Sequence, residues 1–172
     1  TTAMLVMGDA LAISLLSERG FTAEQFAFSH PGGSLGKRLL LSVDQLMSKD
    51  ALIPLNNLDD NLEDAIINMN QKALGMTVII ADKKENNNKP ILAGILTDGD
   101  LRRAFSQDLN LKKAKIKDIM TKNPVTITPN TLASDALIIM KDKKITSIVI
   151  ADSDKSIIGV IHLHHLLKAG LS

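Results

Sequence analysis

Two spacings of apolar residues alternate along the chain, and each predicts one kind of element. Apolar positions three and four residues apart predict amphipathic helices, whereas short runs rich in Ile and Val predict buried strands. A helix is expected over 3–18, ending at Gly20, and then a short helix over 23–28 and an irregular loop over 29–38. Further helices are expected over 43–47, 61–73, 99–107, 116–120, 133–143 and 163–168, and strands over 53–55, 77–81, 91–96, 125–127, 147–151 and 157–161.

The order of elements after residue 40 occurs twice, with Gly159 standing 65 positions after its counterpart Gly94. Four landmarks match in the same order, which indicates an internal duplication. The matched segments are 43–48 with 116–121, 62–66 with 133–137, 77–82 with 147–152, and 94–102 with 159–167. Each copy predicts a three-stranded sheet with helices on one face, so two copies would cover each other's bare faces. The expected fold class is therefore mixed α/β (α+β), built from two small sheets.

The segment 94–103 predicts a strand that ends abruptly and continues as a helix. Thr97 can cap that helix, because its hydroxyl can accept a hydrogen bond from a backbone N–H of the first turn. The junction offers this hydroxyl and the N–H groups near Gly99 to a phosphate, and the carboxylate of Asp100 to a ribose diol. The plain alternative is an ordinary helix cap beside a solvated acidic turn, and the local pattern by itself favours that alternative.

Composition limits the classes of function. Apolar residues make up 45% of the chain but aromatic residues only 2%, so aliphatic side chains and methionine must fill the core. With a net charge of +1, no basic stripe and few rings for base stacking, nucleic acid is not an expected partner. No apolar run approaches the roughly 20 residues of a membrane span, so no membrane association is expected. The lack of cysteine excludes disulfides and thiolate chemistry and fits a reducing compartment such as the cytoplasm.

Histidine and methionine could suggest metal sites, but their spacing does not support them. His162, His164 and His165 can bring two imidazoles together, yet no carboxylate or cysteine lies nearby in the sequence, so no metal site is expected. Four methionines recur at matching positions of the two copies, which predicts packing in the core rather than soft-metal binding. They are Met47, Met69, Met120 and Met140.

Each copy resembles a CBS domain, and the tandem pair resembles a Bateman module, which binds adenosyl or other nucleotides between its repeats. The first copy keeps the family's strand end, a small apolar run followed by Thr97, two residues and Asp100. The resemblance implies that Thr97 contacts phosphate and that Asp100 holds the ribose hydroxyls. The second copy has His162 and His165 at these two places. His162 can still meet a phosphate, but the diol clamp is lost with His165, so at most one functional nucleotide site is expected.

The first 40 residues indicate a more specific family than CBS domains in general. Segments 7–12, 20–22 and 29–37, the last with the sequence His-Pro-Gly-Gly, are similar to the end of the sugar isomerase (SIS) domain of bacterial D-arabinose 5-phosphate isomerases. Segments 75–77 and 97–103 also resemble that family rather than CBS domains in general.

The resemblance implies three parts, namely a SIS tail at 1–40, a first CBS repeat at 41–110 and a second at 111–172. The chain is expected to be the C-terminal piece of a longer enzyme.

That enzyme family interconverts D-ribulose 5-phosphate and D-arabinose 5-phosphate through an enediol, at the entry to Kdo and lipopolysaccharide. The reaction needs a base that moves a proton between neighbouring carbons. His30 matches the family's active-site histidine, and in a Gly-rich loop its imidazole can titrate usefully. Without the family, a lone loop histidine is usually inert. Because the rest of the active site would lie upstream of Thr1, this chain is not expected to catalyse alone.

Three functions remain open: a regulatory and assembly module of an isomerase, a free-standing CBS nucleotide sensor, or a structural dimerisation unit. The SIS-like first 40 residues argue against the second, and Thr97 with Asp100 argues weakly against the third. No cofactor is required. The regulatory ligand implied is an adenine nucleotide, the usual choice of CBS domains, or CMP-Kdo, the end product of the pathway. The resemblance also implies a homodimer through the CBS pair, within a tetramer of the parent enzyme.

Overall fold

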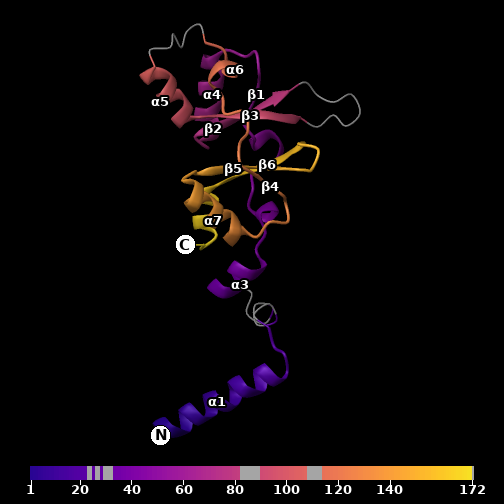
Figure 1. Cartoon of the computed structure of the whole chain (residues 1–172), viewed down its shortest axis with the longest axis vertical. Coiled ribbons are helices and arrows are strands. Elements are labelled where there is room, and N and C mark those ends of the chain that lie inside the picture. The colour runs from indigo at the N-terminus through magenta and orange to yellow at the C-terminus, as the bar shows by residue number, and fades with distance from the viewer. Residues whose placement is uncertain (23–24, 26–27, 29–32, 82–89, 108–113, 172) are drawn as a thin grey trace. The chain divides into compact units, whose positions relative to one another are not determined.

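The computed structural model describes residues 1–22, 25, 28, 33–81, 90–107 and 114–171. The chain divides into two compact units, Thr1–Leu41 and Ser42–Ser172 (Figure 1). Most of the helix predicted over 23–28 lies outside the described residues.

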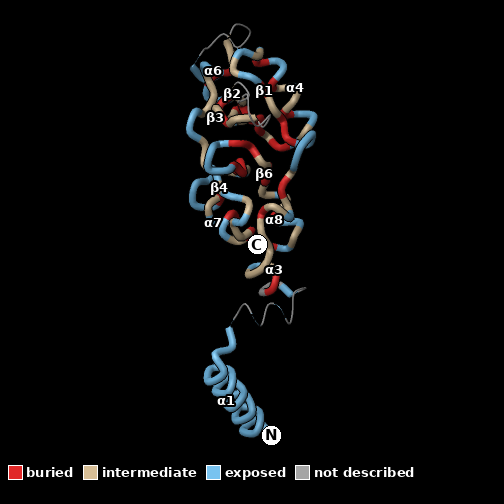
Figure 2. The backbone as a smooth tube through the Cα atoms, turned by 90° about the vertical axis from the view of Figure 1, so that its right-hand side faces the viewer, coloured by how far each residue is buried: buried red, intermediate tan, exposed pale blue. Residues whose placement is uncertain are grey.

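In the described part of the first unit lie the helices α1 (Thr2–Glu18) and α3 (Ser34–Leu40). α1 confirms the helix predicted over 3–18, and Gly20 follows it in the left-handed conformation at φ +61°. No residue of α1 is buried, as Figure 2 shows along its whole length. α3 shows that the loop prediction was wrong over its last five residues. The Lys, Arg and Leu residues at 37–40 are good helix formers and outweigh the glycine at 36.

The second unit contains two three-stranded sheets, in each of which the first strand runs parallel and the last antiparallel to the central strand. The sheets consist of β1 (Leu55–Asn57), β2 (Met76–Ala81) and β3 (Ile91–Thr97), and of β4 (Thr126–Ile127), β5 (Ser147–Ala151) and β6 (Ile157–His162). The helices are α4 (Leu62–Lys72), α5 (Asp98–Ser106), α6 (Ile116–Ile119), α7 (Ala133–Lys143) and α8 (Leu163–Lys168). Two 3₁₀ turns precede them, η1 (Val43–Gln45) and η2 (Asp50–Leu52). The predicted fold class is confirmed.

The first strand of each repeat begins later than the sequence predicted. Pro54 has no N–H, so it can only accept in the ladder, and its carbonyl receives the N–H of Val78 at 2.8 Å. Strand pairing therefore starts at Leu55, whereas 53–55 was expected. The helix predicted over 43–47 is also shorter, since only the 3₁₀ turn η1 forms there.

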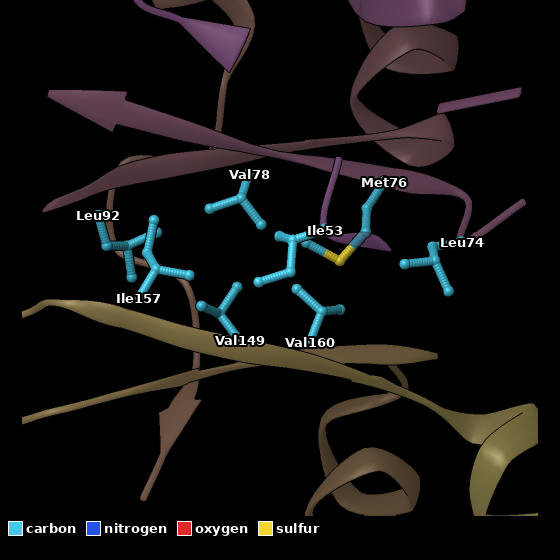
Figure 3. Close-up of a cluster of buried hydrophobic side chains, with 8 residues drawn as sticks. All are labelled: Ile53, Leu74, Met76, Val78, Leu92, Val149, Ile157 and Val160. Carbon is cyan, nitrogen blue, oxygen red and sulfur yellow. The ribbon is translucent and has the colours of Figure 1, made fainter. Parts of the chain in front are cut away.

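The main core lies between the two sheets, which face each other in Figure 3. Buried side chains from both repeats meet there: Ile53, Leu74, Met76, Val78, Leu92, Val149, Ile157 and Val160. The two copies thus cover each other's bare faces, as the duplication predicted. The methionines are core residues too, since Met47, Met69 and Met140 are buried and Met120 packs against a buried cluster.

The opening segment of each repeat packs on the other repeat. α6, which begins the second copy, lies near the start of α4 of the first, since Lys115 before α6 forms an isolated bridge with Asn61 before α4 (Figure 1). Ile116 of α6 is fully buried in a cluster with Leu62 and Ile79. In the reciprocal contact, the N–H of Val43 donates to the carbonyl of Thr131 at 2.9 Å. Each copy therefore completes the core of its partner copy.

Two equivalent glycines let a neighbouring backbone approach the last strand of each sheet. Next to Gly94, Ile95 exchanges two backbone hydrogen bonds with Thr121, at 3.0 and 2.8 Å. A Cβ on Gly94 would lie 2.6 Å from the carbonyl oxygen of Thr121, closer than such atoms can approach. Gly159 plays the same part beside the segment at Ser48, whose carbonyl oxygen would lie 2.9 Å from an added Cβ.

Candidate ligand cleft between the repeats

The junction of β3 and α5 is held by a reciprocal cap. Thr97 stands at the N-cap, where its hydroxyl accepts the N–H of Asp100 at 3.2 Å. Oδ2 of Asp100 in turn accepts the backbone N–H of Thr97 at 2.8 Å and its hydroxyl at 2.6 Å. The predicted cap at Thr97 is confirmed, and it satisfies N–H groups at the helix start that would otherwise lack partners.

The carboxylate of Asp100 is buried, with an exposed fraction of only 4%. Its Oδ1 accepts the hydroxyl of Thr121 at 3.1 Å, and the guanidinium of Arg103 donates to the same oxygen. Thr121 belongs to the second copy, so Asp100 ties the start of α5 to the neighbouring repeat. All of these donors stabilise the charged carboxylate in a buried place, where an unpaired charge would be costly.

The equivalent junction of the second repeat is built from imidazoles. His162 caps α8, and its Nδ1 accepts the N–H of His164 at 3.1 Å. The ring of His165 stands edge-on to that of His162, with 6.3 Å between ring centroids. Burial lowers the pKa of His162 below its usual value, and the neighbouring His165 and His164 lower it further. Burial also lowers the pKa of His165, with smaller contributions from His164 and Lys168.

A cleft of about 550 Å³ lies between the repeats at these junctions. Three of the predicted site residues line it together: Thr97 and Gly99 from the first copy and His162 from the second. Asp100 lines a separate hollow of about 160 Å³, together with α5 and α6 residues. Neither hollow includes His165. The structure thus brings together the groups expected to meet phosphate, while the expected ribose ligand Asp100 lies outside the main cleft.

Cations and aliphatic side chains share the walls of the main cleft. Arg102, Arg103 and Lys144 supply positive charge, and Asp98 is a carboxylate on the same lining. The aliphatic part includes Ile95, Val125 and Ile145. A cleft lined by both cations and aliphatic side chains suits a ligand that has an anionic group and an apolar part.

Lys144 and the segment at 123–125 are cleft residues that the sequence did not single out. Lys144 ends α7 in the left-handed conformation, at φ +54°. The three lysines at 141, 143 and 144 were the available signal, but only the packing of the second repeat against the first puts the last of them on the cleft wall. The segment at 123–125 follows Thr121, whose pairing with Ile95 brings it to the cleft.

Three further predictions concern the catalytic histidine, metal binding and membrane-spanning helices. His30, the expected catalytic histidine, lies outside the described residues. Among the described residues, no group of three or more His, Asp or Glu side chains is arranged to hold a metal ion. Within the same ranges, no helix combines the length and apolar character that crossing a membrane requires.

Comparison with a family model identifies the second repeat. Residues 116–172 match the model described as "CBS domain". Over 171 residues the chain is 47% identical to arabinose 5-phosphate isomerase KdsD of Yersinia pestis, a match that covers 99% of this chain and 50% of that protein. The chain therefore spans about half the length of the curated relatives it matches.

Solved structures show the same fold. CBSX2, in a crystal structure with AMP, matches with a TM-score of 0.63 and 22% identity, over 76% of this chain and 96% of that one. The CBS domain pair of MJ0100, solved with 5′-methylthioadenosine and S-adenosyl-L-methionine, matches with a TM-score of 0.61 and 20% identity, over 74% and 93%. The fold of the second unit is therefore that of a CBS pair, and the chain is related over nearly all of its length to about half of an arabinose 5-phosphate isomerase.

Proposed function

We propose that the cleft between the repeats binds a nucleotide or a CMP-sugar, and that the chain is the regulatory and assembly part of an arabinose 5-phosphate isomerase. The observation that carries this proposal is the cleft of about 550 Å³ that joins Thr97, three cations and an apolar wall. Two proteins with the same fold were solved with adenosine-containing ligands, AMP in one and S-adenosyl-L-methionine in the other. That likeness supports an adenine nucleotide, and the relation to the isomerases supports CMP-Kdo as the alternative.

In this proposal the phosphate meets the hydroxyl of Thr97 and the N–H groups near Gly99, where the start of α5 favours an anion. His162 reaches the same cleft from the second repeat. Asp100 accepts from the ribose hydroxyls after exchanging some of its present donors. His165, which does not line the cleft, takes no part in binding.

Calorimetric titration of the chain with AMP, CMP and CMP-Kdo tests this proposal. Asp100→Ala should weaken binding on the order of tenfold to a hundredfold, because charge-assisted hydrogen bonds to a diol are lost. His165→Ala is the matched control and should leave affinity within about twofold. If affinity for each of these ligands is unchanged in Asp100→Ala while its melting temperature falls, Asp100 is a helix cap only. If none of them binds to the unsubstituted chain, the result favours the alternative function of a structural dimerisation unit.

For the longer enzyme, we propose that His30 acts as the acid or base of the isomerisation. The support is the relation to arabinose 5-phosphate isomerases across the segment that contains it. In the full-length protein, His30→Ala should lower turnover of arabinose 5-phosphate by about 10²-fold or more. His164→Ala serves as the control histidine and should leave turnover unchanged. Near-normal turnover in His30→Ala would reduce His30 to a loop residue.

Assembly is a second proposed role, and one pair of residues favours it. Ile67 of α4 and Ile138 of α7 occupy equivalent positions of the two repeats, and both are more than half exposed. Two aliphatic side chains repeated on helix surfaces suit a contact with a second copy. We expect light scattering at tens of micromolar to give a dimer. The double variant Ile67→Asp with Ile138→Asp should be monomeric, whereas Leu52→Asp, exposed elsewhere, should not change the mass. A monomeric unsubstituted chain would exclude this role.

A further inference from the structure

Arg103 lies on the boundary between the two hollows described above. Its side chain lines both the main cleft and the smaller hollow, whereas Asp100 lines only the smaller one. The guanidinium donates to Oδ1 of Asp100, and its Nη1 lies 3.5 Å from the position that a Cβ on Gly99 would take. The Arg103 side chain thus covers the start of α5 and stands between the buried carboxylate and the cleft.

The two members of this ion pair differ in how firmly they are held. The side chain of Arg103 is 66% exposed, so it can turn at little cost, while Asp100 is 4% exposed and is also bonded to Thr97 and Thr121. An ion pair with one well-exposed partner is weak, because water screens it. A phosphate at the start of α5 would compete with Asp100 for the guanidinium, which recognises phosphate oxygens in a two-pronged geometry.

We propose that Arg103 is a specificity-determining switch that makes the cleft select phosphorylated nucleotides over nucleosides. Without an anion, Arg103 pairs with Asp100 and keeps that carboxylate away from the ribose. When a phosphate occupies the start of α5, Arg103 turns to it, and Asp100 is left to accept from the ribose hydroxyls. A nucleoside has no phosphate to compete for Arg103, so Asp100 stays paired with Arg103 and does not bind the ribose. This inference rests on the proposed nucleotide binding and specifies its ligand class.

The switch predicts opposite effects of one substitution on two ligands. In Arg103→Met an aliphatic side chain remains but the guanidinium is lost, so Asp100 no longer has this ion-pair partner. Affinity for ADP should fall by about tenfold or more, since a charge-assisted contact is lost. Affinity for adenosine should rise or stay the same. The ratio of the two affinities should therefore fall by at least about tenfold. Lys141→Met is the matched control, because Lys141 is an exposed cation that lines neither hollow.

Calorimetric titrations of the unsubstituted chain, Arg103→Met, Arg103→Lys and Lys141→Met with adenosine, AMP and ADP test the inference, and cytidine, CMP and CDP repeat it for the other base. We expect the ratio of ADP affinity to adenosine affinity to fall in Arg103→Met, to recover partly in Arg103→Lys and to change by less than about threefold in Lys141→Met. Equal losses of ADP and adenosine affinity in Arg103→Met, or equal changes in the two Met variants, would overturn the switch but leave nucleotide binding standing. Absence of binding by every nucleotide and nucleoside would overturn both proposals. Thermal melts check that each variant folds, which the exposure of Arg103 and Lys141 favours.

Discussion

Removal of the cap should destabilise the second unit measurably. Thr97→Ala deletes the hydroxyl that accepts from Asp100 N–H and donates to its carboxylate, so the free energy of unfolding should fall by about 1–2 kcal/mol. Urea denaturation followed by circular dichroism measures this. Thr128→Ala, at an exposed hydroxyl, is the control and should change stability by less than about 0.5 kcal/mol. Equal effects of the two substitutions would show that the cap contributes little.

Thr97 and Asp100 show how much of a site a short sequence pattern can reveal. The pattern predicted a cap at Thr97, because a hydroxyl before an apolar helix with an acidic first turn is a local signal. Burial of Asp100 depends on Thr121 and Arg103, whose positions follow from the packing of the repeats and from a side-chain rotamer. The local pattern encodes neither position, so the separation of Asp100 from the main cleft was not predictable from the sequence.

The imidazoles of His162 and His165 predict a dependence of stability on pH. Their pKa values are lowered in the folded chain from the ordinary 6.5, so the unfolded chain binds more protons below that pH. Stability is therefore fully present above about pH 7 and should fall as the pH drops through 6.5 toward the lowered folded pKa values.

Melting temperatures between pH 5 and 8 measure this dependence. The double variant His162→Gln with His165→Gln should flatten the curve in that range. An equally steep curve in the double variant would assign the dependence to other groups.

At the scale of elements, the sequence predicted boundaries most accurately where the apolar periodicity and a helix-ending or strand-ending residue indicate the same position. The boundaries of α7, β5 and α8 match the prediction, since an apolar period of 3.6 or a β-branched run fills each of them. It was least accurate at α3 and β1. At α3 the outcome depends on the competition between Gly36 and the helix formers that follow it. At β1 it depends on where strand pairing begins after Pro54, which has no N–H to donate.

Gly94 offers a test of how closely β3 and the neighbouring repeat must approach. In Gly94→Ala the new Cβ would lie 2.6 Å from the Thr121 carbonyl oxygen, so the two bonds between Ile95 and Thr121 must lengthen or break. We expect a loss of about 1–3 kcal/mol in the free energy of unfolding, measured by urea denaturation. Gly8→Ala is the control, because a Cβ added at Gly8 would have no neighbouring atom within 4 Å, and it should not lower the free energy of unfolding. An unchanged midpoint in Gly94→Ala would mean that the contact is loose.

At the scale of the whole second unit, the shared core predicts a single cooperative transition. Val78 and Val149 come from different repeats and are buried in the same cluster (Figure 3). Val78→Ala should therefore lower the protection of β2 and β5 amides in hydrogen exchange by the same amount, about 2 kcal/mol. Val6→Ala, on exposed α1, should lower neither. A loss confined to β2 would show that the repeats unfold independently.

The exchange of opening segments has a consequence for how such a pair arises. A single copy, alone on its chain, would lack the segment that its neighbour supplies, and two such chains would have to trade segments, as domain-swapped dimers do. Duplication within one chain replaces that association by an intramolecular step, with an effective concentration on the order of millimolar. The cleft between the copies then forms at any dilution of the protein, without a second chain.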